Sequence, residues 1–333
     1  MKICIVGAGS IGGVIASRLH RKGDVTAVLR GENLEAVKKN GYQIVGDRGT
    51  TTTAKVKATD NLKIIGKQDL IILSVKAHQI KEIVNDLEHI IHNQSIIVTM
   101  QNGIPWWYFK KFTSSFSIQH VESVDPKGFI ASNIDADKII GGVVYMAAEK
   151  VKPGVIKSIE NEKISFGELD GSYSNRLRNI CQMFVESGIK APIKKDIRSE
   201  IWIKLMGNCT LNPISAISQS TLSEICQSVQ GRDLLYKMCC EVKNIGETFG
   251  AKFKVSIEDR IKAAENVGHH KTSMLQDIEH GRQTELEALL GSVLELGKIA
   301  KLKTPYLESL YACCSLLDSK LQQTSSFLKI REG

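Results

Sequence analysis

The sequence predicts an α/β protein with a mostly parallel sheet in its N-terminal domain, followed by an all-helical C-terminal domain. In the first half of the chain, short apolar runs typical of buried parallel strands alternate with stretches of helical periodicity. A glycine-rich turn joins the first apolar run to the first helical stretch. From about residue 196 to 319, nearly every stretch has helical periodicity. We therefore divide the chain into a domain of residues 1–195 and a helical domain of residues 196–333.

Length and composition fit this organisation. A chain of 333 residues that is 42% hydrophobic and 24% charged can bury two cores. The net charge of +8 is spread along the chain without interleaved aromatic residues, which favours small anionic ligands over a nucleic-acid surface. No apolar stretch approaches the ~20 residues of a membrane span, and Met1-Lys2 leads into a short apolar run rather than a signal peptide. We expect a cytoplasmic monomer or homodimer that binds neither membrane nor nucleic acid.

The cysteines fit the same compartment. The eight cysteines show no C-x-x-C spacing and have no histidine partner at zinc-ligand distance. The adjacent pairs at 239–240 and 313–314 are poorly placed to bridge to themselves. We expect reduced cytosolic thiols and no metal site.

The first strand and the turn after it carry the first functional motif. Residues 2–6 form a short apolar run, and an apolar-periodic helix follows from about residue 11 to 22. Between them lies Gly7-Ala8-Gly9-Ser10-Ile11-Gly12, a G-x-G-x-x-G pattern in strand–turn–helix context. The glycines allow a tight turn and close approach of the backbone to a pyrophosphate at the helix N-terminus. The pattern predicts a Rossmann-type dinucleotide site; the alternative is a glycine turn at a tight junction.

The end of the second strand bears on the choice of cofactor. Residues 25–29 form this strand, and Arg30 follows it. An NAD enzyme places an acidic residue here to accept from the ribose 2′-hydroxyl, whereas an arginine suits the 2′-phosphate of NADP. Glu32 is the rival candidate for an NAD enzyme. The strand-end position favours Arg30 and therefore NADP; a surface arginine is the alternative.

Two further strands end in polar residues. The pattern predicts a helix at 33–40, paired strands at 42–45 and 50–57, a strand at 69–75, a helix to about 91 and a strand at 95–100. Lys76 and Asn102 follow the last two strands, at the edge where ligands bind in an open parallel sheet. Lys76 can therefore reach a cofactor, and Asn102 can lie near a nicotinamide. Alternatively, Lys76 is an ordinary helix-start lysine and Asn102 belongs to a common Asn-Gly turn.

Residues 105–137 lack a regular pattern and predict an excursion from the first domain, such as a flap. Trp106 and Trp107 within it are either core or lid residues. Beyond it, the pattern predicts a strand at 139–147, a hairpin over 154–167, a helix at 175–187 and a last short strand at 189–194.

A helix at 200–213 opens the second domain and carries a polar stripe. Its apolar positions follow helical periodicity, and we expect Pro213 to end it. A helix advances about 100° per residue, so Lys204, Asn208 and Asn212 lie within an arc of about 80° over roughly 12 Å. The simpler interpretation is a solvated polar face. Asparagine is a poor residue inside helices, however, so two of them on the stripe of a lysine indicate a ligand.

A second polar stretch spans residues 268–285 and contains Ser273 and Glu285. In one unbroken helix these two residues would lie about 18 Å apart. They can share a small ligand only if the helix breaks between them, and Gly281 is a suitable site for the break. A helix from about 284 to 300 would then carry Glu285 in its first turn, where the helix dipole alone also favours an acid.

The chain resembles the ketopantoate reductase family, the 2-dehydropantoate 2-reductases, over essentially its whole length. The matching motifs are GAGSIGG at 7–13, SVKAHQ at 74–79, QNG at 101–103, IRSEIWIKLMGNCTLNPISA at 197–216 and KTSMLQDIEHGRQTE at 271–285. The last two are specific, because a general Rossmann enzyme would not carry both in this order. The resemblance implies an oxidoreductase that reduces 2-dehydropantoate to (R)-pantoate with NADPH in pantothenate biosynthesis.

The same resemblance implies roles for individual residues. Lys204 would be the catalytic proton donor. The substrate-binding residues would be Asn102, Lys204, Asn208, Asn212, Ser273 and Glu285. The cofactor-binding residues would be Gly7, Ala8, Gly9, Ser10, Ile11, Gly12, Arg30, Lys76, Asn102, Ala147 and Glu285. Burial would lower the pKa of Lys204, whereas Glu285 nearby would raise it.

Two departures from the family leave the substrate open. The 105–137 excursion is longer than in the shortest members, and an asparagine that some members carry after the catalytic helix is replaced near Leu222. A reductase of another branched 2-keto acid is therefore an alternative. A regulator that senses NADPH without turnover is a third interpretation, but a sensor needs no proton donor.

Overall fold

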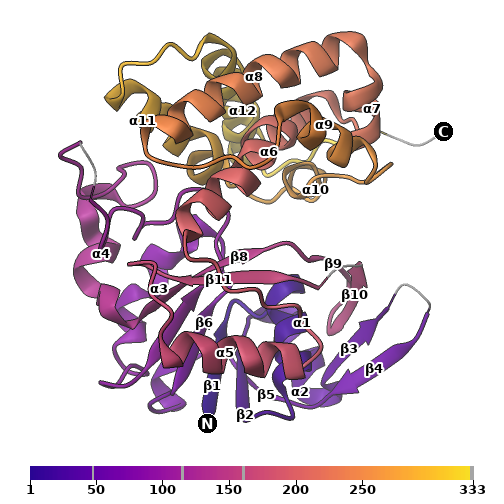
Figure 1. Cartoon of the computed structure of the whole chain (residues 1–333). Helices are drawn as coiled ribbons and strands as arrows, with labels where there is room; N and C mark the ends of the chain where they lie inside the picture. The colour runs from indigo at the N-terminus through magenta and orange to yellow at the C-terminus, as the bar shows by residue number, and fades with distance from the viewer. Residues whose placement is uncertain (47–48, 114–115, 160–161, 331–333) are drawn as a thin grey trace. The chain divides into compact units, whose positions relative to one another are not determined.

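The computed structural model describes residues 1–46, 49–113, 116–159 and 162–330 (Figure 1). The chain folds into two compact units. Unit 1 comprises residues 1–101, 109–113 and 129–197, and unit 2 comprises residues 102–108, 114–128 and 198–333. The sequence pattern placed a single division near residue 195. The longest segment of the second unit begins at Arg198, and the unit also takes in two segments from earlier in the chain.

A seven-stranded sheet forms the centre of unit 1, in the order β11-β8-β7-β6-β1-β2-β5. Its strands are β1 (Lys2–Val6), β2 (Asp24–Val28), β5 (Lys57–Thr59), β6 (Leu70–Leu73), β7 (Ile96–Thr99), β8 (Ile139–Val144) and β11 (Ile164–Glu168). All neighbours run parallel except β11, which is antiparallel to β8. Val6 lies opposite both Val28 and Leu73, so β1, β2 and β6 end level with one another. The predicted mostly parallel sheet is confirmed.

Both faces of this sheet are buried. Ile3 and Ile5 of β1 belong to a core cluster that includes residues of α1 (Ser10–Leu19) and α5 (Asn175–Glu186). Cys4 points to the opposite face and is also fully buried. Figure 1 shows α5 lying across the sheet. Burial on both faces explains why these strands are continuous apolar runs in the sequence.

The remaining helices of unit 1 are short. They are α2 (Gly31–Asn40), α3 (Ile80–Leu87), α4 (Phe129–Asn133) and the 3-10 turns η1 (Leu62–Ile64), η2 (Ala77–Gln79) and η4 (Ala136–Lys138). The predicted helices at 33–40 and 175–187 correspond to α2 and α5 and are confirmed.

A second, four-stranded sheet packs against α1. Its order is β4 (Thr51–Ala54), β3 (Tyr42–Val45), β10 (Val155–Ile159) and β9 (Ala147–Lys152). A Cβ on Gly13 of α1 would lie 2.4 Å from Ile156 Cδ1 and 2.7 Å from a ring carbon of Tyr42, so only glycine allows this close approach. The predicted pairing of residues 42–45 with the following strand is confirmed by the antiparallel β3–β4 pair.

The predicted hairpin over 154–167 is wrong. Strand β10 pairs with β3 and β9 in the four-stranded sheet, whereas β11 pairs with β8 in the seven-stranded sheet. Residues 160–161, within the predicted hairpin, lie outside the described part of the chain. The predicted strand at 189–194 is reduced to two isolated bridges, Lys163 with Lys190 and Phe166 with Ile193.

The excursion at 105–137 buries its aromatic residues, although residues 114–115 within it lie outside the description. Trp106 and Trp107 are only 3% and 1% exposed, so both are core residues and not lid residues. Farther along, the Glu295 carboxylate accepts from the backbone nitrogens of Glu122 and Ser123 at 2.7 and 2.8 Å. These bonds tie the segment before η3 (Pro126–Gly128) to unit 2.

Unit 2 is helical, as predicted, and its described residues contain no strand. Its helices are α6 (Ile197–Ser218), α7 (Leu222–Gln227), α8 (Val229–Thr248), α9 (Ile257–Glu265), α10 (Ser273–Glu279), the π-helical turn η5 (Glu287–Gly291), α11 (Ser292–Ile299) and α12 (Pro305–Thr324).

Helix α6 does not end at Pro213, so that prediction is wrong. The helix continues to Ser218 with the proline inside it. A proline in a helix interior removes one hydrogen bond at a cost of ~3 kcal/mol. Leu211 and Ile214, on either side of the proline, are both 8% exposed, and the Cys314 thiol donates to the Pro213 carbonyl at 3.6 Å. Burial of the flanking side chains therefore outweighs the missing bond.

Candidate active site

The glycine turn after β1 is shaped for close approach by a ligand. Gly7 has a φ of +86°, and a Cβ there would lie 2.5 Å from the backbone nitrogen of Val75. A Cβ on Gly12 would lie 2.4 Å from Ser74 Oγ. Both positions therefore exclude larger residues. A Cβ on Gly9, by contrast, would meet only the Gly7 carbonyl oxygen at 4.0 Å, so the space beside Gly9 is open.

Helix α1 presents its N-terminus at this open side. Gly9 caps the helix without a side-chain hydrogen bond, and the first turn contains no acidic residue. The first N–H groups and the helix dipole therefore favour an anion. The Ser74 hydroxyl holds the turn through the carbonyls of Val6 and Gly7, at 3.1 and 3.0 Å. Residues Gly7–Gly12 thus fit the pyrophosphate of a dinucleotide.

Arg30 and Lys76 lie at the same sheet edge as this turn, because β2 and β6 flank β1. Arg30 follows β2 as the exposed N-cap of α2. Lys76 follows β6, and its backbone nitrogen donates to Gln79 Oε1 at 3.1 Å. Ala147 instead opens β9 and pairs with Ile159 in the four-stranded sheet.

In unit 2, hydrogen bonds join Lys204, Asn102 and Glu285 in a row. Lys204 Nζ donates to Asn102 Oδ1 at 2.6 Å, and Asn102 Nδ2 donates to Glu285 Oε2 at 3.2 Å. The amide oxygen of Asn102 therefore accepts from the cation and its nitrogen donates to the carboxylate, which is the correct role for each atom. The tertiary structure brings together residues that are 102 and 183 positions apart.

Burial lowers the pKa of Lys204 from 10.5 to about 8. Loss of solvation is the largest cause. The negative charge of Glu285 raises the pKa, and the positive charge of Arg260 lowers it further. The sequence did not show whether burial or Glu285 has the larger effect on this pKa. In the structure, burial has the larger effect. A lysine with a pKa near 8 gives up its proton more readily at neutral pH than a surface lysine does.

The rest of the predicted stripe on α6 is also withdrawn from solvent. Asn212 is only 6% exposed, and its Nδ2 donates to Ser273 Oγ at 3.4 Å. Lys204 and Asn208 are half-buried. In the described part of the chain, the Asn208 amide has no hydrogen-bond partner. The interpretation of this stripe as a solvated polar face is therefore wrong.

The chain breaks between Ser273 and Glu285, as predicted. Helix α10 starts at Ser273 and ends at Glu279, and Gly281 has a φ of +61°. Glu285 lies just before the first helical residue, Leu286, rather than in the first helical turn. Its carbonyl accepts from the Leu289 nitrogen at 3.0 Å.

The Gln-Asn-Gly turn is held against the π-helical turn η5. The Ile104 nitrogen donates to the Ala288 carbonyl at 3.1 Å. A Cβ on Gly103, whose φ is +83°, would lie 1.9 Å from the same oxygen. This contact needs glycine, and it sets Asn102 beside Glu285.

Arg260 on α9 also lies beside α6, although no sequence motif points to it. Its guanidinium packs on Gly207 of α6, because a Cβ at Gly207 would lie 2.9 Å from Arg260 Nη2. Gly207 stands between Lys204 and Asn208 in the sequence. A glycine inside a predicted helix was the only local signal, since such a residue usually marks close packing.

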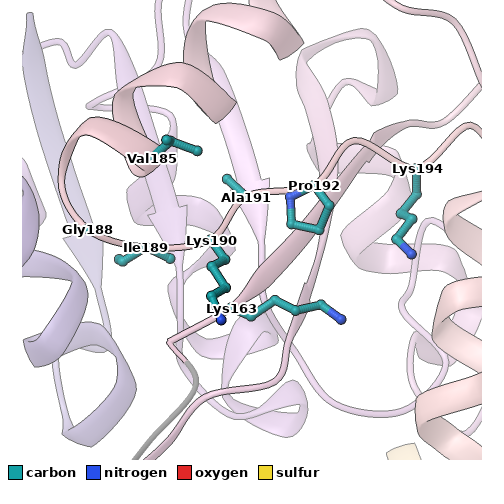
Figure 2. Close-up of a pocket in the computed structure, with 8 residues that line it drawn as sticks. All are labelled: Lys163, Val185, Gly188, Ile189, Lys190, Ala191, Pro192 and Lys194. Atoms are coloured by element: carbon teal, nitrogen blue, oxygen red, sulfur yellow. The ribbon is translucent and has the colours of Figure 1, made fainter.

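Figure 2 shows a surface hollow in unit 1 that shares no residue with these groups. It lies beside the turn after α5 and is lined by Lys163, Val185, Gly188, Ile189, Lys190, Ala191, Pro192 and Lys194. Lysines are the only ionisable residues that line it, and no carboxylate or amide side chain lies among them to orient an ammonium. It offers no chemistry comparable to that of Lys204.

The parallel sheet and the glycine turn are those of a dinucleotide-binding protein. Comparisons with known proteins extend this assignment. Residues 3–171 match the family model of ketopantoate reductase PanE/ApbA, and residues 196–318 match the model of its C-terminal region. The chain belongs to the ketopantoate reductase PanE/ApbA family.

Individual relatives agree with this membership. A 2-dehydropantoate 2-reductase of Mesorhizobium japonicum is 41% identical over 94% of this chain and 96% of its own length. One from Pyrococcus horikoshii is 28% identical over 92% of this chain and 93% of its own. A provisionally assigned ketopantoate reductase of Ralstonia solanacearum has a crystal structure similar to this one, with a TM-score of 0.90, 32% identity and coverage of 96% and 98% of the two chains.

A more distant neighbour shares the fold. It is D-mandelate dehydrogenase, solved in a ternary structure with NADH and anilino(oxo)acetate. Its TM-score is 0.82 at 22% identity, and the similarity covers 96% of this chain and 99% of that one.

None of the helices described is long and apolar enough to cross a membrane. Among the same residues, no group of three or more His, Cys, Asp or Glu side chains could hold a metal ion.

Proposed function

We propose that this protein reduces 2-dehydropantoate to (R)-pantoate with NADPH. The observation that carries the proposal is the hydrogen-bonded row of Lys204, Asn102 and Glu285, in which a lysine of lowered pKa is held by an amide. The similarity to a 2-dehydropantoate 2-reductase at 41% identity supports this substrate.

Lys204 is the proton donor. As the C2 carbonyl is reduced, negative charge grows on its oxygen, and the ammonium stabilises that charge and then protonates it. A pKa of about 8 keeps most of the lysine charged at neutral pH while easing release of the proton. Asn102 Oδ1 orients the ammonium, and the charge of Glu285 helps to keep it protonated.

Asn208, Asn212 and Ser273 hold the polar groups of the substrate. The Asn212–Ser273 hydrogen bond is long, at 3.4 Å, and therefore weak. A substrate oxygen can replace it at little cost. The Asn208 side chain keeps its donors and acceptor for a ligand, because no described residue uses them. Asn102 and Glu285 contribute to the same site.

NADPH, when bound, supplies the hydride. Residues Gly7–Gly12 hold the pyrophosphate at the N-terminus of α1, and Arg30 takes the 2′-phosphate. Lys76, at the end of the neighbouring strand β6, adds a positive charge. The family pattern also assigns cofactor contacts to Asn102, Ala147 and Glu285, and we include these three residues in the cofactor site.

The proposal assigns cofactor binding to residues 1–195 and substrate chemistry to residues 196–333 together with Asn102. The eight free cysteines support a cytoplasmic location, because an oxidising compartment favours disulfides. A monomer or a homodimer is compatible with a small-molecule substrate.

The competing functions differ in turnover. A reductase of another branched 2-keto acid would consume NADPH with a different substrate. An NADPH-sensing regulator would bind the cofactor without consuming it. An NAD enzyme would use Glu32 in place of Arg30.

One assay separates these functions. Purified protein is mixed with NADPH or NADH and with 2-dehydropantoate or a panel of branched and aromatic 2-keto acids, and nucleotide oxidation is followed by absorbance. We expect the highest kcat/KM for 2-dehydropantoate with NADPH. A higher kcat/KM for another 2-keto acid would reassign the substrate. NADPH binding without oxidation on any substrate would make the protein a sensor.

A further inference from the structure

Arg260 is a half-buried cation that the proposed mechanism does not use. It lies on α9, which also carries the carboxylates of Glu258, Asp259 and Glu265. Asp259 accepts from the Ser256 hydroxyl at 2.8 Å, and Glu265 pairs with Arg232 at 3.3 Å. Across the residues that the structure describes, no hydrogen bond or ion pair joins the Arg260 guanidinium to another side chain.

The guanidinium is directed to the face of α6 that carries Lys204. The three heavy atoms nearest to the Cβ position of Gly207 all belong to Arg260, at 2.9, 3.5 and 3.6 Å. Gly207 follows Lys204 by three residues, so the two positions are neighbours on one helix face. Arg260 and Lys204 are also close enough to interact electrostatically.

Lys204, Arg260 and Glu285 together have one unbalanced positive charge. Lys204 and Arg260 are cations, and Glu285 is the carboxylate that acts on Lys204. A 2-keto acid brings one negative charge, and its carboxylate carbon is bonded directly to the carbonyl carbon. A carboxylate group that binds one helical turn from Lys204 therefore leaves the keto oxygen within reach of the ammonium.

We propose that Arg260, seated on Gly207, binds the carboxylate of the substrate and makes the site selective for 2-keto acids over neutral carbonyl compounds. The planar guanidinium offers two parallel N–H donors that match a carboxylate, and charge-assisted pairs of this kind are the strong ones. A Cβ at Gly207 would lie 2.9 Å from Arg260 Nη2, so a side chain there would displace the guanidinium. The inference rests on the proposed function and names how its substrate is recognised.

The test compares Arg260→Met with Lys262→Met. The control removes the same charge from an exposed position on the same helix. For each protein we measure kcat and KM for 2-dehydropantoate, the inhibition constants of pantoate and of its neutral amide, and Tm. In Arg260→Met we expect both KM and the pantoate inhibition constant to rise about 10- to 100-fold. The amide constant should change less than about twofold, and Lys262→Met should match the wild type.

Two further variants separate binding from folding. Arg260→Lys should recover only part of the loss, because an ammonium cannot form the two parallel bonds. Gly207→Ala keeps the charge but displaces the guanidinium, and alanine is the better helix former. It should therefore raise the KM and the pantoate constant while Tm holds or rises, which a purely structural role for Arg260 would not produce.

The results distinguish this inference from the proposed function. Wild-type oxidation of NADPH by a 2-keto acid tests the proposed function alone. If the wild type turns over, an unchanged ratio of acid to amide constants in Arg260→Met overturns the role of Arg260. Equal losses for acid and amide would also overturn it, because they would show a general distortion of the site.

Discussion

The glycine turn of unit 1 and the lysine-bearing face of α6 in unit 2 form their candidate sites in opposite ways. The turn offers backbone N–H groups from consecutive residues, and its shape depends on missing side chains at Gly7 and Gly12. The α6 face offers side chains, and their partners come from distant parts of the chain, such as Asn102 and Glu285. A backbone site therefore tolerates few added atoms, whereas a side-chain site tolerates few removed ones.

The two regions also treat charge differently. The helix N-terminus carries a fixed partial charge that does not titrate. Lys204 carries a full charge whose pKa is lowered to about 8 by burial. The first region is suited to holding an anion at any pH, and the second is suited to transferring a proton.

The largest expected effect comes from removing the Lys204 ammonium. Lys204→Met should lower kcat by roughly 10²–10⁴-fold, the usual range for a positioned proton donor. The dissociation constant for NADPH, measured by fluorescence titration, should stay unchanged because the glycine turn and Arg30 are intact. Tm at pH 7 should hold or rise, since the buried charge costs stability. Turnover near that of the wild type would remove Lys204 from the mechanism.

The proton-transfer role also predicts a pH dependence. With a folded-state pKa of about 8, the acid form is lost above that pH, and kcat should fall about tenfold per pH unit. Glu285 raises the pKa of Lys204, so Glu285→Gln should move this fall to lower pH. The lysine binds its proton less tightly in the folded than in the unfolded state, so its contribution to the unfolding free energy should increase between pH 8 and 10.5. A flat kcat profile from pH 6 to 10 contradicts the assignment.

The turn should respond to added rather than removed atoms. Gly12→Ala places a methyl group 2.4 Å from Ser74 Oγ and 2.7 Å from the Gly7 carbonyl oxygen, and should lower the unfolding free energy by about 1–3 kcal/mol. Gly9→Ala is the matched control for stability, because its Cβ meets open space. It should barely change denaturant unfolding while it weakens NADPH binding. Equal stability losses in the two variants would show that the turn is not shaped as described.

Arg30 tests cofactor choice within unit 1. The wild type should bind NADPH at least about tenfold more tightly than NADH, because a charge-assisted phosphate contact contributes about 1.5–3 kcal/mol. Arg30→Ala should erase most of that preference, and Glu32→Ala should leave it in place. Equal wild-type affinities for the two nucleotides, measured by calorimetry, would instead favour NAD and Glu32.

The smallest expected effect is at Ser273, whose hydroxyl accepts the long hydrogen bond from Asn212. Ser273→Ala should raise KM for the keto acid about 2- to 10-fold with little change in kcat, as expected for the loss of one neutral hydrogen bond. Ser256→Ala, which removes a hydroxyl from the N-cap of α9, is a control for stability. A large fall in kcat in Ser273→Ala would place the hydroxyl at the reacting oxygen.

Local sequence alone predicted much of this protein. The buried strands, the glycine turn and the polar stripe of α6 were predictable because each depends on neighbours within one or two helical turns or on alternation along a strand. The break near Gly281 was predictable for the same reason, since a positive φ is a property of the residue itself. The roles of these residues in catalysis remain proposals.

Tertiary structure decided what local patterns could not. Residues 155–159 and 164–168 look like one hairpin, yet they pair with β3 and β8 in different sheets, although Ile156 and Ile164 are buried in the same core. Pro213 stays inside α6 because its flanks are buried. Arg260 lies beside Gly207, and Asn102 lies beside Lys204, only through long-range packing. Which distant side chains come into contact depends on how whole helices and strands pack. The spacing of residues along the chain does not predict those contacts.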